Sequence, residues 1–228
     1  LILPRYNSDL KRNVVDLIDV DSFKILHTYK HDINKFNKTI KTNSIIHSRI
    51  ELDNSPIRFI YWHPKILEDT SLIANGSTAL FKIDKCEKLT WYKKEYFFHH
   101  SVMIDYEENI WASGTLIPNS EFISKFKRKK GFMDDAIFKI NSNNGKVLFK
   151  KSIIEMLYQN KILNNQQIFD ENNDPIHVND IEVAMKDTLY WEKNDLFISI
   201  RNQSAIIHYR PSTNKVINYI KGPFYMQH

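Results

Sequence analysis

The sequence contains one cysteine, Cys86, and no apolar run that approaches the roughly 18 residues of a membrane-spanning helix. An intrachain disulfide is therefore excluded, and the cysteine content does not indicate whether the protein works in a reducing or an oxidising compartment. Cys86 stands in a Lys-Cys-Glu-Lys turn between two strand-like runs, so we interpret it as a loop residue rather than a catalytic thiol. No signal peptide is visible, but the chain starts at Leu1 rather than Met, and we expect the natural N-terminus to be incomplete.

Several catalytic motifs are absent as well, namely a Gly-rich phosphate loop, a G-x-S-x-G nucleophile and a Cys-x-x-Cys pair. The net charge of +5 is only mildly basic, and much of the excess lies in residues 125–130. We interpret this run as a solvated loop, because the chain lacks the aromatic interleaving of a single-strand nucleic-acid binder. Asp134 and Asp135 precede a strand-like run and are expected to cap or solvate it.

What the sequence does contain is an internal repeat. An apolar or alternating run, a polar turn and a second run of the type Lys-apolar-x-aromatic recur roughly every 60 residues. The copies occupy residues 14–29, 79–91, 136–149 and 205–219. This pattern predicts β-hairpins, and the spacing suits four-stranded blades with generous loops.

A further pair of strands is predicted upstream of the later hairpins, which completes each blade. The first strand of the pair begins with a polar residue, which is His63, His100 or Asn179, and His228 would open the next blade. Innermost strands of a propeller converge on its central channel, so these side chains are expected to cluster. Singly, each would be a turn former or a structural histidine, but as a set they favour a shared site.

We therefore predict an all-β fold, a β-propeller of four-stranded blades that forms a single domain over residues 1–228. About three blades look complete, and a propeller must close to remove its sheet edges, so the chain is expected to be truncated at one or both ends. Residues 30–50 are predicted to be a surface insertion. In residues 152–173, a Ser152-x-x-Glu155 capping box predicts a short helix, followed by a loop that overhangs the channel mouth.

The polar residues near the C-terminus indicate anion chemistry. His177 and Asn179 are separated by one residue, so on a strand they face the same side. Arg201 ends a neighbouring apolar strand, where its charge needs an anion or a carboxylate partner such as Glu182 or Asp180. Together with the histidines, these groups suit sulfate or phosphate better than a metal ion, which arginine would repel. No metal site is predicted.

Four stretches resemble the bacterial arylsulfotransferase family, whose members use aryl sulfates rather than a nucleotide as sulfate donor. They are His99-His100-Ser101-Val102, Asp174-Pro175-Ile176-His177-Val178-Asn179-Asp180, Ser199-Ile200-Arg201-Asn202 and Gly222-Pro223-Phe224-Tyr225-Met226-Gln227-His228. The resemblance covers most of the chain from about Trp62 onward. It implies a propeller with six blades and an active site at the centre of one channel mouth.

The resemblance also implies a ping-pong reaction that is independent of PAPS, in which a histidine takes sulfate from a phenolic ester and passes it to another phenol. The catalytic residues implied are His228, which is transiently sulfated, His100, His177 and Arg201. The substrate-binding residues predicted beside them are Asn179, His63, His99, Trp191 and Tyr190, the last two for stacking an aromatic ring. His100 is favoured over His99, and which of His100 and His177 exchanges protons with the phenols stays open.

Two other hypotheses compete with this interpretation. One is a non-catalytic propeller that binds a ligand or a partner protein, and the other is a lyase or hydrolase that acts on sulfated glycans. A degenerate site would lack some of the polar residues, but all five are present, namely His100, His177, Asn179, Arg201 and His228. The expected partners are an aryl sulfate and a phenol, without cofactor, nucleic acid or membrane span; a homodimer is allowed. Because the family is mostly exported, a periplasmic or secreted location is expected.

Overall fold

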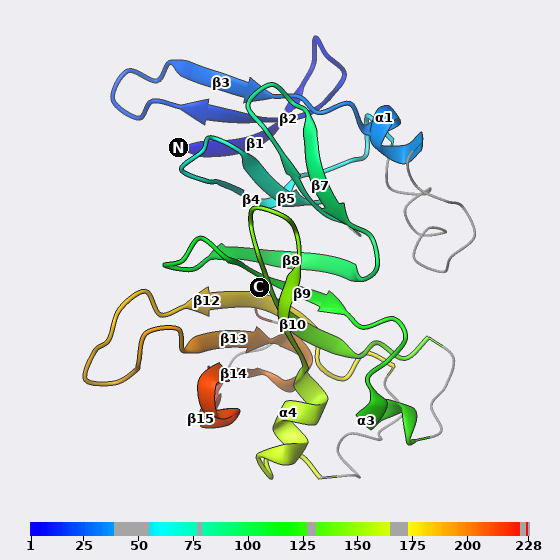
Figure 1. Ribbon diagram of the computed structural model, residues 1–228, viewed down its shortest axis with the longest axis vertical. Helices are drawn as coiled ribbons and strands as arrows, with labels where there is room; N and C mark the ends of the chain where they lie inside the picture. Colours follow the sequence, from blue (N-terminus) through cyan, green and yellow to red (C-terminus); the bar gives the residue numbers. More distant parts are fainter. Residues whose placement is uncertain (39–54, 77–78, 127–130, 165–172, 224–226, 228) are drawn as a thin grey trace. The chain divides into compact units, whose positions relative to one another are not determined.

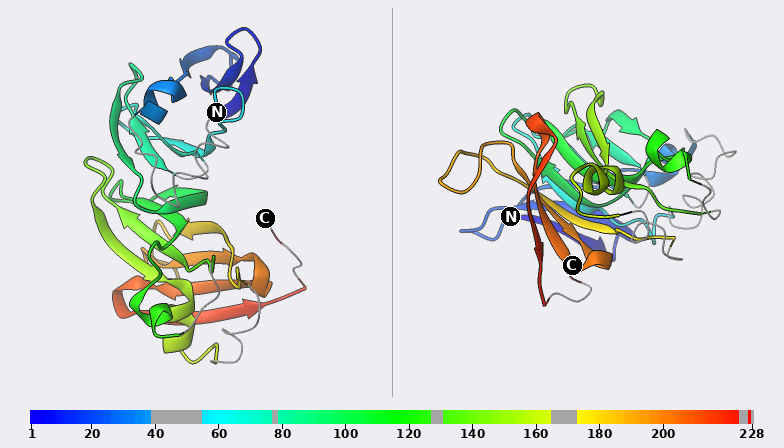
Figure 2. Two further views of the ribbon diagram at one scale, coloured as in Figure 1. Left: turned by 90° about the vertical axis from the view of Figure 1, so that its right-hand side faces the viewer. Right: turned by 90° about the horizontal axis from the view of Figure 1, so that it is seen from below.

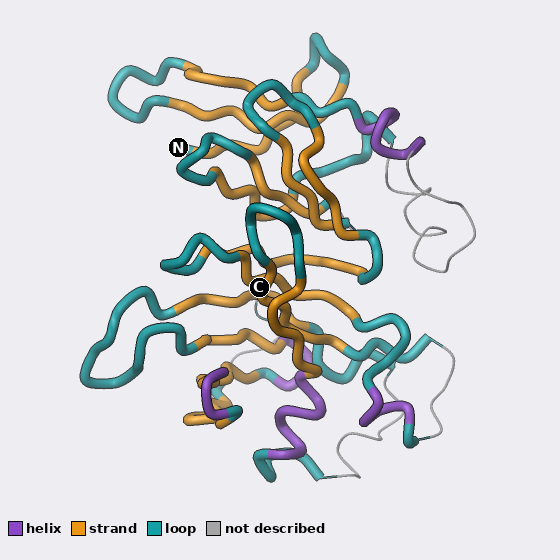
Figure 3. The backbone as a smooth tube through the Cα atoms, in the orientation of Figure 1, coloured by secondary structure: helices purple, strands orange, loops and turns teal. Residues whose placement is uncertain are grey.

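The computed structural model describes residues 1–38, 55–76, 79–126, 131–164, 173–223 and 227 (Figure 1). Within these residues, antiparallel strands predominate and the helices are short, as Figure 3 shows. The predicted all-β class is therefore confirmed. The chain divides into two compact units, which are described separately. One contains Leu1–Val102 and Asn143–Gly145, and the other contains Met103–Ser142 and Lys146–His228.

The first unit holds a sheet in the order β1-β2-β3 and a second sheet in the order β4-β5-β6-β7. The strands are β1 (Ile2–Asn7), β2 (Arg12–Ile18), β3 (Ile25–Tyr29), β4 (Trp62–Ile66), β5 (Leu72–Asn75), β6 (Leu80–Ile83) and β7 (Leu89–Lys93). Within each sheet every strand pairs antiparallel with the next one, so both sheets are meanders. The helix α1 (Ile33–Lys38) follows β3.

The unit boundary falls within β8 (Phe97–Ile104), the first strand of a sheet in the order β11-β10-β9-β8. The last sheet has the order β12-β13-β14-β15 and can be followed from yellow to red in Figure 2. The remaining strands are β9 (Ile110–Thr115), β10 (Asp135–Ile140), β11 (Val147–Ser152), β12 (Val178–Val183), β13 (Leu196–Ile200), β14 (Ala205–Arg210) and β15 (Lys215–Lys221). The helices are α3 (Glu121–Ser124), α4 (Ile153–Gln159) and the single-turn η1 (Arg201–Gln203) and η2 (Pro211–Thr213). Three sheets in the described chain are thus four-stranded meanders, which confirms the predicted blades.

The burial of the strands explains the sequence pattern. The middle strands β5 and β9 are buried along their whole length, whereas the outermost strand β11 alternates between half-buried and exposed residues. A strand covered on both faces needs a continuous apolar run, and a strand with one wet face needs alternation. Each unit has its own apolar core, which surrounds Phe81 in the first unit and Trp111 in the second.

The predicted short helix is α4. Ser152 Oγ accepts a hydrogen bond from the backbone N–H of Glu155 at 3.3 Å, and the apolar residues of the first turns are buried. None of the described helices is long and apolar enough to cross a membrane. The predicted loop over the channel mouth falls mostly on residues 165–172, and most of the predicted insertion falls on residues 39–50. Both of these segments lie outside the described residues.

In each four-stranded sheet, the turn after the first strand carries an aspartate that pairs with a cation on the third strand. The pairs are Asp69–Lys82 (2.8 Å), Asp105–Lys139 (2.9 Å) and Asp195–Arg210 (2.8 Å). In the last sheet, Asp195 also accepts a hydrogen bond from His208 Nε2 at 2.8 Å. These pairs explain why a cationic residue interrupts the apolar pattern of each third strand.

The Asp195 carboxylate is 1% exposed, and replacing it by Asn should destabilise the fold. Burial alone would raise the pKa of Asp195, but hydrogen bonds from Arg210 and His208 lower it to about 2. Asp195→Asn is therefore expected to reduce the free energy of unfolding at pH 7 by about 3 kcal/mol, the cost of breaking a buried ion pair. Because the folded-state pKa lies below the unfolded one, the difference should be full at pH 7 and shrink as the pH falls from about 4 towards 2.

Urea denaturation at a series of pH values measures this difference. Asp21→Asn, in an exposed turn, is the matched control and should change the stability by less than about 0.5 kcal/mol. A difference for Asp195→Asn that does not depend on pH would contradict the assignment.

Candidate functional site

Three histidines at the innermost strands share a left-handed backbone. The φ angles are +43° at His63 in β4, +53° at His100 in β8 and +54° at His177, directly before β12. A non-glycine residue in this region costs roughly 1–2 kcal/mol, so its recurrence requires support from the surroundings. The sequence comparison of the blades put Asn179 in this series, but the backbone puts His177 there, two residues earlier.

In the second unit, hydrogen bonds from the backbone and side chains of η1 hold the backbone carbonyls of the segment Asp174–His177. Arg201 N donates to the carbonyl oxygen of His177 (2.9 Å), Asn202 N to that of Ile176 (3.1 Å), Asn202 Nδ2 to that of Asp174 (2.6 Å), and Gln203 Nε2 to that of Pro175 (2.8 Å). His177 and Arg201 therefore lie side by side at one end of the β12–β13 pair. Neither residue belongs to a strand, contrary to expectation: His177 directly precedes β12 and Arg201 directly follows β13 as the first residue of η1.

His177 has a carboxylate beside its ring. Its Nδ1 lies 2.6 Å from Oδ2 of Asp174, and the two side chains are 18% and 22% exposed. This pair differs from the other histidine–aspartate pair of the unit, His208 with Asp195, whose side chains are 3% and 1% exposed. His177 is accessible to a ligand, whereas His208 is part of the packed interior.

Arg201 is half-buried, and its Nε donates to Oδ1 of Asn202 at 3.2 Å. Within the described part of the chain, neither Asp180 nor Glu182 forms an ion pair with its guanidinium. The alternative of a structural salt bridge therefore finds no support. A half-buried guanidinium without a carboxylate is suited to bind an anion through charge-assisted hydrogen bonds.

Asn179 links this end of the sheet to the end of the chain. It is 3% exposed and forms a bulge in β12, where its Nδ2 donates to the backbone carbonyl of Gln227. The side-chain amide of Gln227 donates in turn to the carbonyl oxygens of Ile200 and Ala205, both at 3.2 Å. Gln227 is thus anchored where β13 ends and β14 begins. His228, the predicted nucleophile, follows it and lies outside the described residues.

The first unit holds the other histidines. His99 is 9% exposed and His100 is half-buried, with their ring centroids 5.2 Å apart. The carbonyl of His100 accepts a hydrogen bond from Nδ2 of the fully buried Asn75 at 3.0 Å. His63 is exposed in β4, and the ring of its neighbour Trp62 lies 5.9 Å from that of His100. The greater exposure of His100 favours it over His99 as a ligand-binding group.

Tyr190 and Trp191 lie away from His177 and Arg201. They belong to the turn that joins β12 to β13, at the left in Figure 1, whereas His177 and Arg201 lie at the other end of the same strands. Tyr190 is 77% exposed and Trp191 is 36% exposed. Tyr190 and Trp191 are close to Asn179 in sequence, but the length of β12 separates them from it in space.

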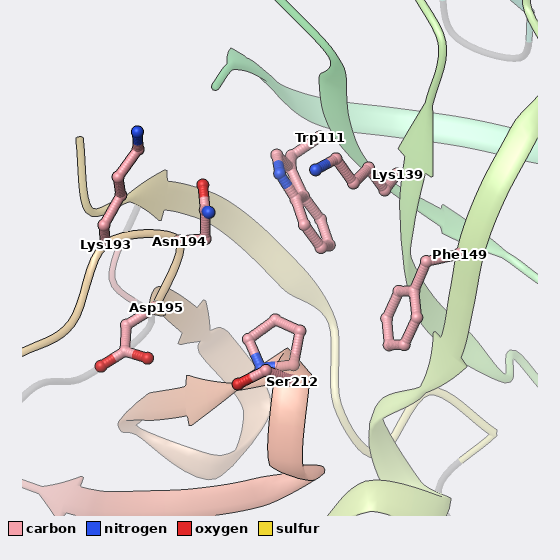
Figure 4. A pocket seen from close by; sticks show the side chains of 8 residues that line it. Trp111, Lys139, Phe149, Lys193, Asn194, Asp195 and Ser212 are labelled. Carbon is pink, nitrogen blue, oxygen red and sulfur yellow. The ribbon is translucent and has the colours of Figure 1, made fainter. Parts of the chain in front are cut away.

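A cavity of about 290 Å³ lies in the second unit. In Figure 4, Trp111, Lys139 and Phe149 stand on one side of it, and Lys193, Asn194, Asp195 and Ser212 on the other. Of its charged groups, Lys139 pairs with Asp105 and Asp195 pairs with Arg210, whereas the Nζ of Lys193 lies over the ring of Tyr106, 3.3 Å from its centroid. Asp195 directly precedes β13, at the end of the strand opposite Arg201. The cavity lies at the strand ends opposite His177 and Arg201, and it is therefore separate from the residues around His177.

The structure also assigns roles to residues that the sequence analysis interpreted otherwise or passed over. Asp134 and Asp135, expected to cap or solvate a hairpin, are both fully buried. Asp135 accepts hydrogen bonds from the N–H of Val178 (2.9 Å) and the hydroxyl of Thr115 (3.0 Å), and so holds the start of β12 beside His177. The available signal was two adjacent carboxylates directly before a buried strand, because a buried carboxylate must be hydrogen-bonded.

Comparisons with known proteins agree with this architecture. A family model described as arylsulfotransferase (ASST) matches residues 63–228. The chain is similar to a protein of unknown function from Bacteroides caccae, at 11% identity and a TM-score of 0.53, over 96% of this chain and 57% of that one. It is also similar to the β-propeller domain of Cps50 (Swd1) from Myceliophteria thermophila, at 9% identity and a TM-score of 0.50, over 93% of this chain and 58% of that one.

At these identities the similarity shows the fold alone, and it confirms the predicted β-propeller. The chain spans less than two thirds of the length of either solved structure. No curated protein matches it.

Replacing Arg201 by Gln should remove anion binding without loss of stability. Because its guanidinium has no carboxylate partner among the described residues, the free energy of unfolding without added anion should change by less than about 0.5 kcal/mol. Sulfate should raise the melting temperature of the original protein by more than that of Arg201→Gln, because a ligand that binds the folded state stabilises it.

The measurement is thermal unfolding in sodium sulfate and in sodium chloride at equal ionic strength. Arg210→Gln is the matched control, which should lose stability through Asp195 and retain the response to sulfate. Equal responses to sulfate in Arg201→Gln and in the original protein would exclude Arg201 as the anion ligand.

Proposed function

Because the chain belongs to the arylsulfotransferase family, we propose that it carries the sulfate-transferring site of a PAPS-independent aryl sulfotransferase. The family supports a sulfotransferase-type function. The finer proposal is a ping-pong reaction from a phenolic sulfate ester to a phenolic acceptor, through a sulfated His228. The other residues of the site in this proposal are His100, His177, Asn179 and Arg201.

The first half-reaction forms one bond and breaks another. A ring nitrogen of His228 attacks the sulfur of the aryl sulfate, the bond from sulfur to the aryl oxygen breaks, and the phenolate leaves with a proton from a second histidine. Neutral imidazole is a competent nucleophile near neutral pH. In the second half, the acceptor phenol oxygen attacks sulfur, the N–S bond breaks and the phenol proton returns to that histidine.

The observation that carries this proposal is the anchoring of Gln227. Its backbone carbonyl accepts from Asn179, and its side-chain amide donates to Ile200, the residue before Arg201. The residue that precedes His228 is therefore held at the end of β12 and β13 that also carries His177 and Arg201. This arrangement supports a nucleophile at position 228 next to an anion-binding arginine.

Arg201 supplies the charge that such a transfer needs. Its half-buried guanidinium has no carboxylate partner among the described residues and would bind the non-bridging oxygens of the sulfuryl group. Charge-assisted hydrogen bonds of this kind stabilise the charge that develops in the transition state. Asn179 gives its amide to the backbone of Gln227, so its contribution in this proposal includes holding the peptide that carries His228.

His100 is included in the proposed site because of its place in the propeller fold. In a propeller the innermost strands converge on the channel, and His100, which lies within β8, shares its left-handed backbone with His177, which directly precedes β12. We extend the proposal to a single propeller domain with a periplasmic or secreted location and small-molecule substrates.

Sulfation of His228 is tested by mass spectrometry after a brief incubation with 4-nitrophenyl sulfate and a rapid quench. The peptide that contains His228 should gain the mass of one sulfuryl group, and added phenol should remove it while phenyl sulfate appears. The adduct should be absent in His228→Ala.

His27→Ala, in β3, is the matched control and should retain the adduct. A folded protein that gives neither adduct nor nitrophenol would contradict the proposed reaction and favour a binding module. Release of nitrophenol without transfer to phenol would instead indicate a hydrolase.

A further inference from the structure

We propose that Asp174 is a positioning residue for His177, which it holds with the hydrogen on Nδ1 so that Nε2 exchanges protons with the phenol oxygens. This inference rests on the proposed function and identifies His177 as the histidine that carries the proton.

The geometry of the pair fixes the position of the hydrogen. Nδ1 of His177 lies 2.6 Å from Oδ2 of Asp174, which is the distance of a strong hydrogen bond. An ionised carboxylate only accepts hydrogen bonds, so Nδ1 must be the donor. In the neutral ring Nε2 then carries the lone pair, and it is the nitrogen that can take up a proton.

The backbone carbonyls of the loop are held by groups other than the Asp174 carboxylate. Two backbone N–H groups and two side-chain amides of η1 already hold the carbonyl groups of the whole segment Asp174–His177, including that of Asp174 itself, which accepts from Asn202 Nδ2. The side chain of Asp174 is therefore available to orient the ring. This separates the position of the loop from the orientation of the imidazole, and each can be perturbed alone.

The two histidine–aspartate pairs of the second unit differ in the ring nitrogen that bonds to the carboxylate and in their exposure. His208 bonds to Asp195 through Nε2, and both side chains are buried, at 3% and 1% exposed; Asp195 also accepts from Arg210. His177 bonds to Asp174 through Nδ1 in a pair that is partly exposed, so its ring remains accessible to a substrate. The first pair is arranged for stability and the second for proton exchange.

The proton balance closes over one turnover. In the first half-reaction the protonated ring gives the proton on Nε2 to the oxygen of the leaving phenolate. In the second half the neutral ring takes a proton at Nε2 from the acceptor phenol as its oxygen attacks sulfur. Without Asp174, the neutral ring could carry its hydrogen on Nε2, where it would block this second transfer.

The test compares two donors in Asp174→Ala. Phenyl sulfate has a poor leaving group that needs a proton, so the rate of its single-turnover phenol release should fall by at least about 10²-fold, as expected for a lost general acid. 4-Nitrophenolate leaves without a proton, so the loss with 4-nitrophenyl sulfate should be below about tenfold. Asp174→Glu should restore part of the rate with phenyl sulfate.

Asn202→Ala is the matched control, because it loosens the segment without removing the carboxylate. It should slow both donors by the same factor. Equal losses for the two donors in Asp174→Ala would overturn the proposal and leave Asp174 a structural role.

A second measurement does not depend on activity. The ring nitrogen shifts of His177, assigned with His177→Gln, should report the Nδ1–H form in the original protein and in Asn202→Ala, and a substantial Nε2–H population in Asp174→Ala. An unchanged tautomer in Asp174→Ala would overturn the proposal. If the original protein transfers no sulfate, the proposed function fails, while the tautomer still decides the role of Asp174.

Discussion

Buried polar side chains hold the starts of the innermost strands, and the candidate site depends on them. Asn75 donates to the carbonyl of His100, and Asp135 accepts from the N–H of Val178, the residue after His177. Both side chains are fully buried. The hydrogen bond to the buried carboxylate of Asp135 is worth about 1.5–3 kcal/mol and the neutral one from Asn75 about 0.5–1.5 kcal/mol, which is comparable to the roughly 1–2 kcal/mol cost of a left-handed histidine. The backbone at each histidine is therefore positioned before any ligand arrives.

The opposite ends of the same strands serve a different purpose. There, an aspartate in the first turn of each four-stranded sheet pairs with a cation on the third strand, as in Asp195 with Arg210. These pairs neutralise Lys139 and Asp195, two of the charged groups that line the cavity of the second unit. At the other end, Arg201 has no such partner among the described residues, and His177 has a partly exposed carboxylate beside it. One end of these strands therefore carries ion pairs that stabilise the sheet. The other end carries Arg201 and His177, for which we propose a role in catalysis.

For the proposed sulfate transfer, this arrangement divides the work among different groups. Arg201 would hold the sulfuryl oxygens, Asp174 would orient His177, and Asn179 with Gln227 would hold the peptide of the nucleophile. Preorganised groups of this kind need no rearrangement as charge develops, which is the main advantage of a rigid β-scaffold over a mobile loop.

The repeat in the sequence was sufficient to predict the strands of the four-stranded sheets, and the capping box the helix that begins after Ser152, because alternation, turns and caps are local properties of the chain. The first strand, β1, was not predicted. The motifs around His177 and Arg201 also indicated which residue types would meet, since a hairpin brings the start of one strand beside the end of the next. The same pattern could not show that Tyr190 and Trp191 lie at the far end of that hairpin, because closeness in sequence does not say which strand end a side chain shares. Nor could it show that Asp135 is buried against Val178, or that Asn179 binds the backbone of Gln227. These contacts join residues more than 40 positions apart, and only the packing of one sheet against the next segment of chain decides them.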